Sequence, residues 1–600
     1  MKYKLINEMN KNYTAIEQIL FNRGIAEKDF FHYLNTTDAD INDAEALGEE
    51  RLKAGAAALI QTIKNNGKIF LVVDSDADGY TSSALLLNYL HDSFPAFVEN
   101  NIVYYIHTGK EHGLKDCINL AVGYDMVILP DSSSNDYSEH EMLKVNNIPV
   151  LILDHHEAEK ISPDAIVINN QLSDYPNKDF SGVGIVWQFC KYLDKLLEIE
   201  NADNYLDLVA LGNCADMMSL KSIETKHLMN KGFKQLKNPF FSYMADKNSF
   251  SLGSTLTPMG VAFYVVPFIN AMQRSGTQEE KELLFKSMLS FKAFESVPST
   301  KRGHKAGEME KIVEQAVRTV TNVKNRQTRA QDACMELLEK MIVEQDLLQH
   351  KVLLFLLEPG LIDKNIAGLC ANKIMAKYQR PCCILTKVEE TSYNPIEMLL
   401  GTMVPEKTVI KYQGSARNYD KSGILNFKDI CTETGLVDYA EGHQGAFGLS
   451  LPEENIQQFL EKTDVAFENM SPEPLYLVDY IYKGVDVKPD NILDIAGLND
   501  IWGQGMEESF IAIENLKVSK ETLTLMGLDK GKPTLKITLP NKISLIKFGS
   551  NQEEYNSLYS EGYVSINVVG RCNANEWMGR TTPQVLIEEF EIVGMNKYNF

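Results

Sequence analysis

The sequence predicts an α/β protein built from several domains, and three observations support this fold class. At about 150 residues per domain, a chain of 600 residues is expected to form three or four packed units. Short apolar runs alternate with helix-like segments between residues 55 and 225, which favours a mostly parallel sheet covered on both faces. A content of 44% hydrophobic and 24% charged residues is typical of a globular protein.

The first domain is expected to span residues 1–225 and to contain the parallel sheet. Helices are predicted over 54–63 and 81–90, and strands over 68–73, 124–129 and 150–153. These strands are short and continuously apolar, as strands buried on both faces are. The carboxyl ends of such strands meet at one edge of the sheet, where open α/β sheets bind ligands.

The rest of the chain predicts three further domains. Residues 226–345 are expected to be a helical connector without strands, and residues 346–470 a second, smaller αβ domain. Residues 471–600 alternate polar and apolar side chains over short runs, a pattern that predicts a small antiparallel barrel.

Charge and cysteine content limit the function classes. A net charge of −23 excludes a protein that coats nucleic acid through bulk positive charge, although not an enzyme with one basic groove. Residues 301–330 hold eight Lys or Arg against three Glu, which fits either a solvated helix face or a basic wall beside a substrate channel. The nine scattered cysteines, and the lack of a signal peptide or a membrane-length apolar run, predict a cytoplasmic protein with reduced thiols.

Carboxylate and imidazole side chains follow the predicted strands. Taken alone, the DxDxDG segment at 74–79 fits an acidic turn or a calcium loop as well as a metal site. Acidic residues and histidines also follow the next two strands, however, and another acid follows an apolar helix at 205–211. Oxygen ligands favour Mg²⁺ or Mn²⁺, and these groups are numerous enough for two ions. The candidate residues are Asp74, Asp76, Asp78, Asp131, Asp154, His155, His156 and Asp216.

These segments resemble known motifs. DSDADGYTS (74–82), LPD (129–131), LDHH (153–156) and CADMMSL (214–220) are similar, in that order, to the four motifs of the DHH phosphoesterase superfamily. PFINAMQR (267–274), GSARN (414–418) and GHQGAFG (442–448) resemble motifs of the RecJ single-stranded-DNA exonucleases. The segment from Trp502 onward resembles the RecJ OB-fold, so the resemblance covers about residues 35–600.

The resemblance implies a DHH-type parallel-sheet domain, a DHH-associated αβ domain across a cleft, a helical connector and a C-terminal OB-fold barrel. It also implies two Mn²⁺ (or Mg²⁺) ions per active site, with Asp131 as the bridging ligand. In this assignment Asp154 orients an imidazole, His156 faces the scissile phosphate and Asp74 acts from outside the ligand set. The implied metal ligands are Asp76, Asp78, Asp131, His155 and Asp216.

The resemblance also implies phosphate contacts away from the metals. Ser415 and Arg417 are expected to hold a terminal phosphate, and His443 another phosphate near the metals. Asn270 and Arg274 are further substrate contacts in this assignment. Three segments depart from the family pattern. Glu441 stands where a glycine is usual, Phe268 and Gln273 replace Arg and Gly, and in the loop 106–114 Lys110 is the candidate to replace an arginine.

The function implied is hydrolysis of single-stranded DNA by a processive 5′-to-3′ exonuclease that releases mononucleotides. Two alternatives are a DHH phosphodiesterase that cleaves short oligonucleotides or cyclic dinucleotides, and a non-catalytic RecJ-like replication scaffold. The expected partners are single-stranded DNA and a single-strand-binding protein or helicase, with no membrane association and a monomeric chain.

Overall fold

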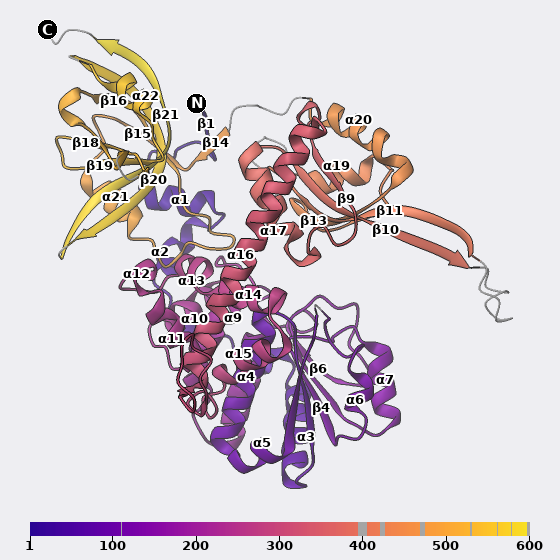
Figure 1. Ribbon diagram of the computed structural model, residues 1–600. Coiled ribbons are helices and arrows are strands. Elements are labelled where there is room, and N and C mark those ends of the chain that lie inside the picture. Colours follow the sequence, from indigo (N-terminus) through magenta and orange to yellow (C-terminus); the bar gives the residue numbers. More distant parts are fainter. Residues whose placement is uncertain are drawn as a thin grey trace. The chain divides into compact units, whose positions relative to one another are not determined.

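The computed structural model describes the chain except residues 110, 394–404, 420–425, 469–474, 529–530, 561, 578 and 597–600 (Figure 1). The chain divides into two compact units. The N-terminal unit comprises Asn10–Lys324 and Leu493–Ser509, and the C-terminal unit comprises Met1–Met9, Asn325–Ile492 and Phe510–Phe600. The predicted boundary at 470/471 lies outside the described residues.

A five-stranded parallel sheet forms the centre of the N-terminal unit. Its strand order is β3-β2-β4-β5-β6 and every neighbouring pair is parallel, as the sequence predicts. The strands are β2 (Ile69–Val73), β3 (Ile102–Ile106), β4 (Met126–Pro130), β5 (Val150–Asp154) and β6 (Ile166–Asn169).

Helices cover both faces of this sheet (Figure 1). One face packs against α6 (Ile118–Ala121) and α7 (Tyr137–Val145) through a buried apolar cluster. The other face packs against α3 (Glu49–Lys64), α4 (Ala77–Ser93) and α8 (Gly182–Leu197). Because both faces are covered, every residue of β2, β4 and β5 is buried, which explains their continuous apolar sequences.

Several of the remaining helices of this unit pack on α4 or α8. The helix α9 (Leu206–Ala215) packs on both of them, and α14 (Val266–Ser275) packs on α4 and α9. The others are α1 (Ala15–Asn22), α2 (Phe30–Leu34), α5 (Pro95–Asn101), α10 (Ile223–Phe233), α11 (Pro239–Lys247), α12 (Ser249–Leu252), α13 (Pro258–Tyr264) and α15 (Gln278–Met288).

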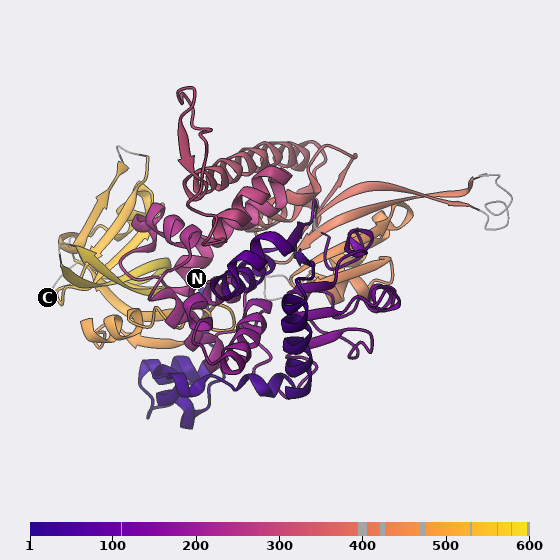
Figure 2. The same cartoon turned by 90° about the horizontal axis from the view of Figure 1, so that it is seen from below.

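The prediction that residues 226–345 lack strands is wrong at one place. Strands β7 (Ser296–Pro298) and β8 (Met309–Lys311) form an antiparallel hairpin, which stands away from the helices in Figure 2. Each strand is only three residues long, too short for a period-2 pattern to be recognised. The unit boundary falls within the long helix α16 (Ile312–Glu344) that follows.

The C-terminal unit contains a second αβ sheet, with the order β12-β13-β11-β10-β9. One face packs on α16 and α17 (Lys364–Tyr378), and the other on α19 (Phe427–Glu433) and α20 (Ile456–Ala466). Strands β9 and β10 are parallel and the other pairs are antiparallel. The strands are β9 (Leu353–Leu357), β10 (Cys382–Tyr393), β11 (Pro405–Arg417), β12 (Tyr439–His443) and β13 (Ala446–Pro452).

The predicted C-terminal barrel is a seven-stranded sheet with the order β15-β16-β20-β21-β19-β18-β17. It is mixed rather than purely antiparallel, because β15 pairs with β16 and β19 with β21 in parallel. Its elements are β15 (Tyr480–Lys483), α21 (Pro489–Ala496), β16 (Ile511–Val518), β17 (Leu523–Met526), β18 (Thr534–Thr538), β19 (Ser544–Phe548), α22 (Gln552–Leu558), β20 (Tyr563–Trp577) and β21 (Arg580–Asn596).

Two segments belong to a different unit from the residues next to them in the sequence. Strand β1 (Lys2–Leu5) pairs in parallel with β14 (Leu475–Val478) in the C-terminal unit. Conversely, the Leu493–Ser509 segment belongs to the N-terminal unit, where the amide of Leu220 donates to the carbonyl of Gln504. Among the described residues, no helix combines the length and apolarity needed to cross a membrane.

Candidate active site

Acidic residues and histidines gather at the carboxyl edge of the parallel sheet, as predicted. Asp74 and Asp131 directly follow β2 and β4, and Asp154 ends β5 just before the two histidines. Asp76 is the N-cap of α4, where its side chain accepts a hydrogen bond from the amide of Gly79. Asp216 joins them from the carboxyl end of α9.

Three groups of these side chains are close enough to bind a cation. In each group one nitrogen or oxygen atom per residue lies within 4.8 Å of the others. Asp131 and His155 each belong to two groups, so ions in neighbouring groups would share a ligand. The groups are Asp74, Asp76 and Asp131; Asp78, His155 and Asp216; and Asp131, His155 and His156.

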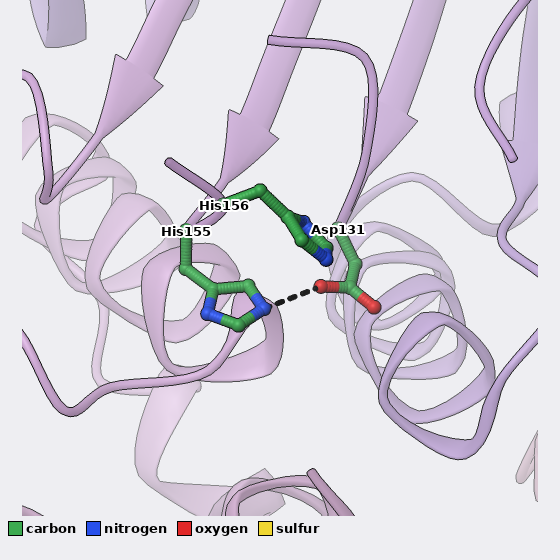
Figure 3. Close-up of side chains that lie close together, drawn as sticks. All are labelled: Asp131, His155 and His156. Carbon is green, nitrogen blue, oxygen red and sulfur yellow. Dashed lines mark ion pairs between the residues drawn. The ribbon is translucent and has the colours of Figure 1, made fainter. Parts of the chain in front are cut away.

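Asp131 is the side chain that most clearly requires a cation. It is fully buried, and neither carboxylate oxygen accepts a hydrogen bond from the part of the chain that the structure describes. Its Oδ1 lies 3.2 Å from Nε2 of His155, which points toward it in Figure 3. Burial and the nearby charge of Asp78 raise the pKa of Asp131 well above its usual range. A buried carboxylate without hydrogen bonds is costly, so these residues fit a divalent metal ion.

His155 is suited to be a neutral metal ligand. Its Nε2 lies 3.3 Å from Asp216 Oδ2 and 4.0 Å from Asp78 Oδ2. Burial and the neighbouring charge of His156 lower the pKa of His155 to about 4. The ring is therefore unprotonated near neutral pH, as metal coordination requires.

Two further acids of the cluster, Asp78 and Asp216, have raised pKa values. Oδ2 and Oδ1 of Asp78 accept hydrogen bonds of 2.6 and 3.2 Å from the amides of Gly182 and Val183, at the start of α8. Burial and the charge of Asp76 nevertheless raise the pKa of Asp78 to about 7. Burial and the charge of Asp78 raise the pKa of Asp216 to about 8. A bound cation would favour the ionised forms.

Asp154 orients His156 instead of facing the metal groups. Its Oδ1 accepts a 2.7 Å hydrogen bond from His156 Nδ1, and its Oδ2 accepts one from the amide of Ser134. Burial opposes ionisation of Asp154, but the hydrogen bond and charge of His156 outweigh it and lower the pKa of Asp154. Burial likewise opposes charging of His156, but its bond to Asp154 raises the pKa of His156 to about 9.

Three glycines allow this dense packing of carboxylates. A Cβ on Gly182 would lie 2.3 Å from Asp131 Oδ1, and one on Gly212 would lie 2.4 Å from Asp78 Oδ1. A Cβ on Gly79 would lie 2.5 Å from the Cβ of Asp74. Any larger side chain at these positions would displace a carboxylate.

His112, which was not among the predicted site residues, contacts the acidic cluster. Its Nδ1 lies 2.6 Å from Asp74 Oδ2. Burial raises the pKa of Asp74, and the hydrogen bond from His112 opposes this shift without cancelling it. The segment that follows β3 carries His112, so the signal was the same strand-end pattern used for the other residues. It was overlooked because β3 was not among the predicted strands.

The candidate phosphate residues of the C-terminal unit gather at one end of its αβ sheet. Arg417 on β11 is in register with Ala446 on β13, which is in register with His443 on β12. Ser415 lies two residues before Arg417 and so shares its face of the sheet. A Cβ on Gly368 of α17 would lie 2.5 Å from Arg417 Nη2 and 3.3 Å from Ser415 Oγ.

Of the three other predicted substrate contacts, the structure describes two, and both lie on one helix. Asn270 and Arg274 lie on α14, where Asn270 is half-buried and Arg274 is exposed. This helix packs on α4 and α9, the two helices that position Asp76, Asp78 and Asp216. Lys110 lies outside the described residues.

Comparison with known proteins gives family matches for two regions. Residues 68–213 match the DHH family, N-terminal domain, and residues 478–589 match the RecJ OB domain. The chain is 35% identical over 597 residues to YorK of Bacillus subtilis (strain 168), whose name marks it as an inferred SPbeta prophage-derived single-strand DNA-specific exonuclease. That match covers 99% of this chain and 98% of YorK.

A more distant sequence relative and two solved structures are also similar to this chain. The chain is 24% identical to the single-stranded-DNA-specific exonuclease RecJ of Bacillus subtilis (strain 168), over 98% of this chain and 69% of that protein. The fold is similar to the crystal structure of RecJ in complex with Mn²⁺ from Thermus thermophilus, with a TM-score of 0.66 and 17% identity. This match covers 96% of this chain and 76% of that one. The Mg²⁺ complex of the same protein gives a TM-score of 0.60 at 16% identity, over 96% and 74% of the two chains.

Proposed function

The chain belongs to the RecJ-like family of DHH nucleases, and on that premise we propose that it is a 5′-to-3′ exonuclease that degrades single-stranded DNA processively. The observation that carries this proposal is Asp131, whose two buried oxygens accept no hydrogen bond within the described structure. It stands among carboxylates and an imidazole that fit divalent cations. The relatives named as exonucleases specific for single-stranded DNA support the substrate class.

We propose that five side chains bind two ions, Mn²⁺ or Mg²⁺, with Asp131 shared between them. The recurrence of Asp131 and His155 in neighbouring groups supports a shared-ligand arrangement. When bound, two such ions lower the pKa of water and stabilise negative charge on the attacking and leaving oxygens of a phosphodiester. The proposed ligands are Asp76, Asp78, Asp131, His155 and Asp216.

The chain's own side chains would orient the substrate. His156, held through Nδ1 by Asp154, has its other ring nitrogen available to donate to a phosphate oxygen. Its pKa of about 9 keeps the imidazole charged near neutral pH, which favours an anionic partner. Asp74 would support the site without binding metal, since its Oδ2 is hydrogen-bonded by His112.

A second set of residues would bind phosphate in the C-terminal unit. The planar guanidinium of Arg417 can pair with two phosphate oxygens, and Ser415 and His443 add hydrogen bonds from the same end of the sheet. We propose Asn270 and Arg274 as weaker contacts to the sugar–phosphate backbone, from α14.

Two observations bear on the alternatives. The match to the RecJ OB domain over residues 478–589 favours long single strands over short oligonucleotides or cyclic dinucleotides, because OB-folds bind single strands along a groove. The presence of every expected metal ligand argues against a non-catalytic scaffold. We further propose that the chain acts as a monomer beside a single-strand-binding protein or helicase.

Calorimetric titration with Mn²⁺, combined with hydrolysis assays, tests the metal proposal. Two Mn²⁺ per chain and cleavage of long single-stranded DNA are expected from the wild type. Hydrolysis of only dinucleotides or cyclic dinucleotides would select the first alternative. Metal binding without hydrolysis of any of these substrates would select the scaffold.

A further inference from the structure

A second carboxylate–imidazole pair lies beside the metal centre. His112 Nδ1 is 2.6 Å from Asp74 Oδ2, and the amide of Gly113 lies 3.4 Å from the other oxygen of this carboxylate. The pair repeats the arrangement of His156, whose Nδ1 is 2.7 Å from Asp154 Oδ1. Both aspartates are buried, whereas the two imidazoles are 58% and 51% exposed.

Both imidazoles line the same cavity, which has a volume of about 560 Å³. This volume is within the range of small-molecule sites, and so it is large enough for a nucleotide unit. The Nδ1 of one ring is hydrogen-bonded to Asp74, and the Nδ1 of the other is hydrogen-bonded to Asp154. Nε2 is therefore the ring nitrogen with which each histidine can contact a ligand in the cavity.

The other polar groups of the cavity also favour an anion. Ser132 is 4% exposed, and its hydroxyl has no hydrogen-bond partner among the described residues. The carboxylate of Asp136 is already engaged, because Oδ2 accepts from the amide of Leu114 and the hydroxyl of Ser133. Glu157 is exposed at the cavity wall and is the acid that could weaken anion binding.

We infer that His112 and His156 together bind a phosphate group of the nucleic-acid substrate through their Nε2 atoms, so that His112 is a second histidine in contact with the substrate. This inference rests on the proposed function, because the phosphate is supplied by a DNA strand at the metal centre. The phosphate is either the scissile one or the 5′-terminal one.

The competing explanation is that His112 only holds Asp74 in place. Two substitutions separate the roles. In His112→Asn the amide can replace the Nδ1 donor to Asp74 but cannot reach the cavity, whereas in His112→Gln the amide approximates the position of Nε2. His32→Asn is the matched control, because His32 also pairs with a carboxylate at 2.6 Å, is 51% exposed and lies outside this cavity.

The experiment measures Mn²⁺ affinity, kcat/KM with Mn²⁺, and equilibrium binding of a short oligothymidylate with Ca²⁺ in place of Mn²⁺. For His112→Asn we expect unchanged Mn²⁺ affinity and a loss of oligonucleotide affinity and kcat/KM on the order of tenfold to 100-fold. His112→Gln should recover part of this loss, and His32→Asn should behave like the wild type. If the loss occurs only with a 5′-phosphorylated strand, the terminal phosphate is the ligand; an equal loss with a 5′-hydroxyl strand indicates the scissile phosphate.

Two results would overturn the inference. In the first, His112→Asn binds and cleaves DNA like the wild type. In the second, its Mn²⁺ affinity falls in proportion to its activity, which would make His112 a support for Asp74 alone. The binding assay needs no turnover. A wild type that binds the oligonucleotide through His112 without cleaving it would contradict the exonuclease proposal and leave this one standing.

Discussion

At the scale of single residues, Asp131 combines complete burial with a carboxylate that accepts no hydrogen bond in the described structure. Such a group destabilises the metal-free protein, and a bound cation removes the cost. The neutral amide of Asp131→Asn avoids the cost of the buried charge, so the free energy of unfolding of the metal-free protein should not fall by more than about 1 kcal/mol. The substitution should also lower hydrolysis by at least about 10³-fold.

The measurement is thermal unfolding with and without Mn²⁺, beside a hydrolysis assay. Wild-type protein should gain about 2.7 kcal/mol for each bound ion when the free metal is 100 times the dissociation constant of its site, and this gain should be lost in the variant. Asp174→Asn, at an exposed aspartate, is the control. Retained hydrolysis in Asp131→Asn would refute the assignment of Asp131 as a shared ligand.

The raised pKa values of Asp78 and Asp216 predict that the stability of the metal-free protein and its affinity for Mn²⁺ change in opposite directions with pH. Their folded pKa values, about 7 and about 8, lie above the pKa of aspartate in the unfolded chain. At pH values between the unfolded and the folded pKa, the folded state therefore binds more protons than the unfolded state. The metal-free protein should lose stability as pH rises from about 5 to about 8. Mn²⁺ affinity should increase over the same range, because binding displaces these protons. Calorimetric titrations at several pH values check this, and Asp216→Asn should flatten the dependence.

At the scale of elements, the start of α8 positions two of the carboxylates. The amide of Gly182 donates to Asp78 Oδ2, and its Cα faces Asp131 so closely that a methyl group would lie 2.3 Å from Oδ1. We expect Gly182→Ala to cost about 1–3 kcal/mol of stability through overpacking and to weaken Mn²⁺ binding at least about tenfold.

Denaturant unfolding and Mn²⁺ titration measure the two effects. The matched control is Gly594→Ala on β21, where the nearest atom to an added Cβ is 3.8 Å away. A Gly182→Ala variant with wild-type metal affinity would show that Asp131 can move without loss of the site.

The sequence predicted those elements whose pattern is local and strong. Strands β2, β4 and β5 were recognisable because both faces are buried and every residue is apolar. Strand β3 is partly exposed, so its apolar run is less distinctive, and its omission concealed His112. The close approach of Gly182 to Asp131 joins residues about 50 positions apart and depends on tertiary packing, which no local pattern encodes.

At the scale of the whole molecule, the candidate metal ligands belong to one unit and the candidate phosphate residues Ser415, Arg417 and His443 to the other. We therefore expect the residues of the C-terminal unit to contribute to substrate binding and not to metal binding. Arg417→Ala should raise KM for single-stranded DNA on the order of tenfold to 100-fold, because a charged hydrogen-bonded contact is lost. Mn²⁺ binding should be unchanged.

Steady-state kinetics and metal titration of the same preparation test this separation. Arg417→Lys should recover only part of the loss, since a point charge does not reproduce the planar guanidinium. If Mn²⁺ stoichiometry fell in Arg417→Ala, the two roles could not be assigned to separate units.

The composition of the units could not be predicted from the sequence. The pairing of β1 with β14 joins residues more than 470 positions apart, and the Leu493–Ser509 segment lies with residues that precede it by several hundred positions. Neither segment has a composition that indicates its partner. The clustering of the candidate residues could be predicted, because four strand or helix ends converge on one sheet edge in this topology.

The most direct test of the central claim is time-resolved degradation of single-stranded DNA in Mn²⁺, with the label at the 5′ end in one reaction and at the 3′ end in the other. We predict immediate release of labelled mononucleotide from the 5′ label and gradual shortening of the 3′-labelled strand. Release of mononucleotide from the 3′ label first, or no cleavage of long strands, would contradict a 5′-directed exonuclease.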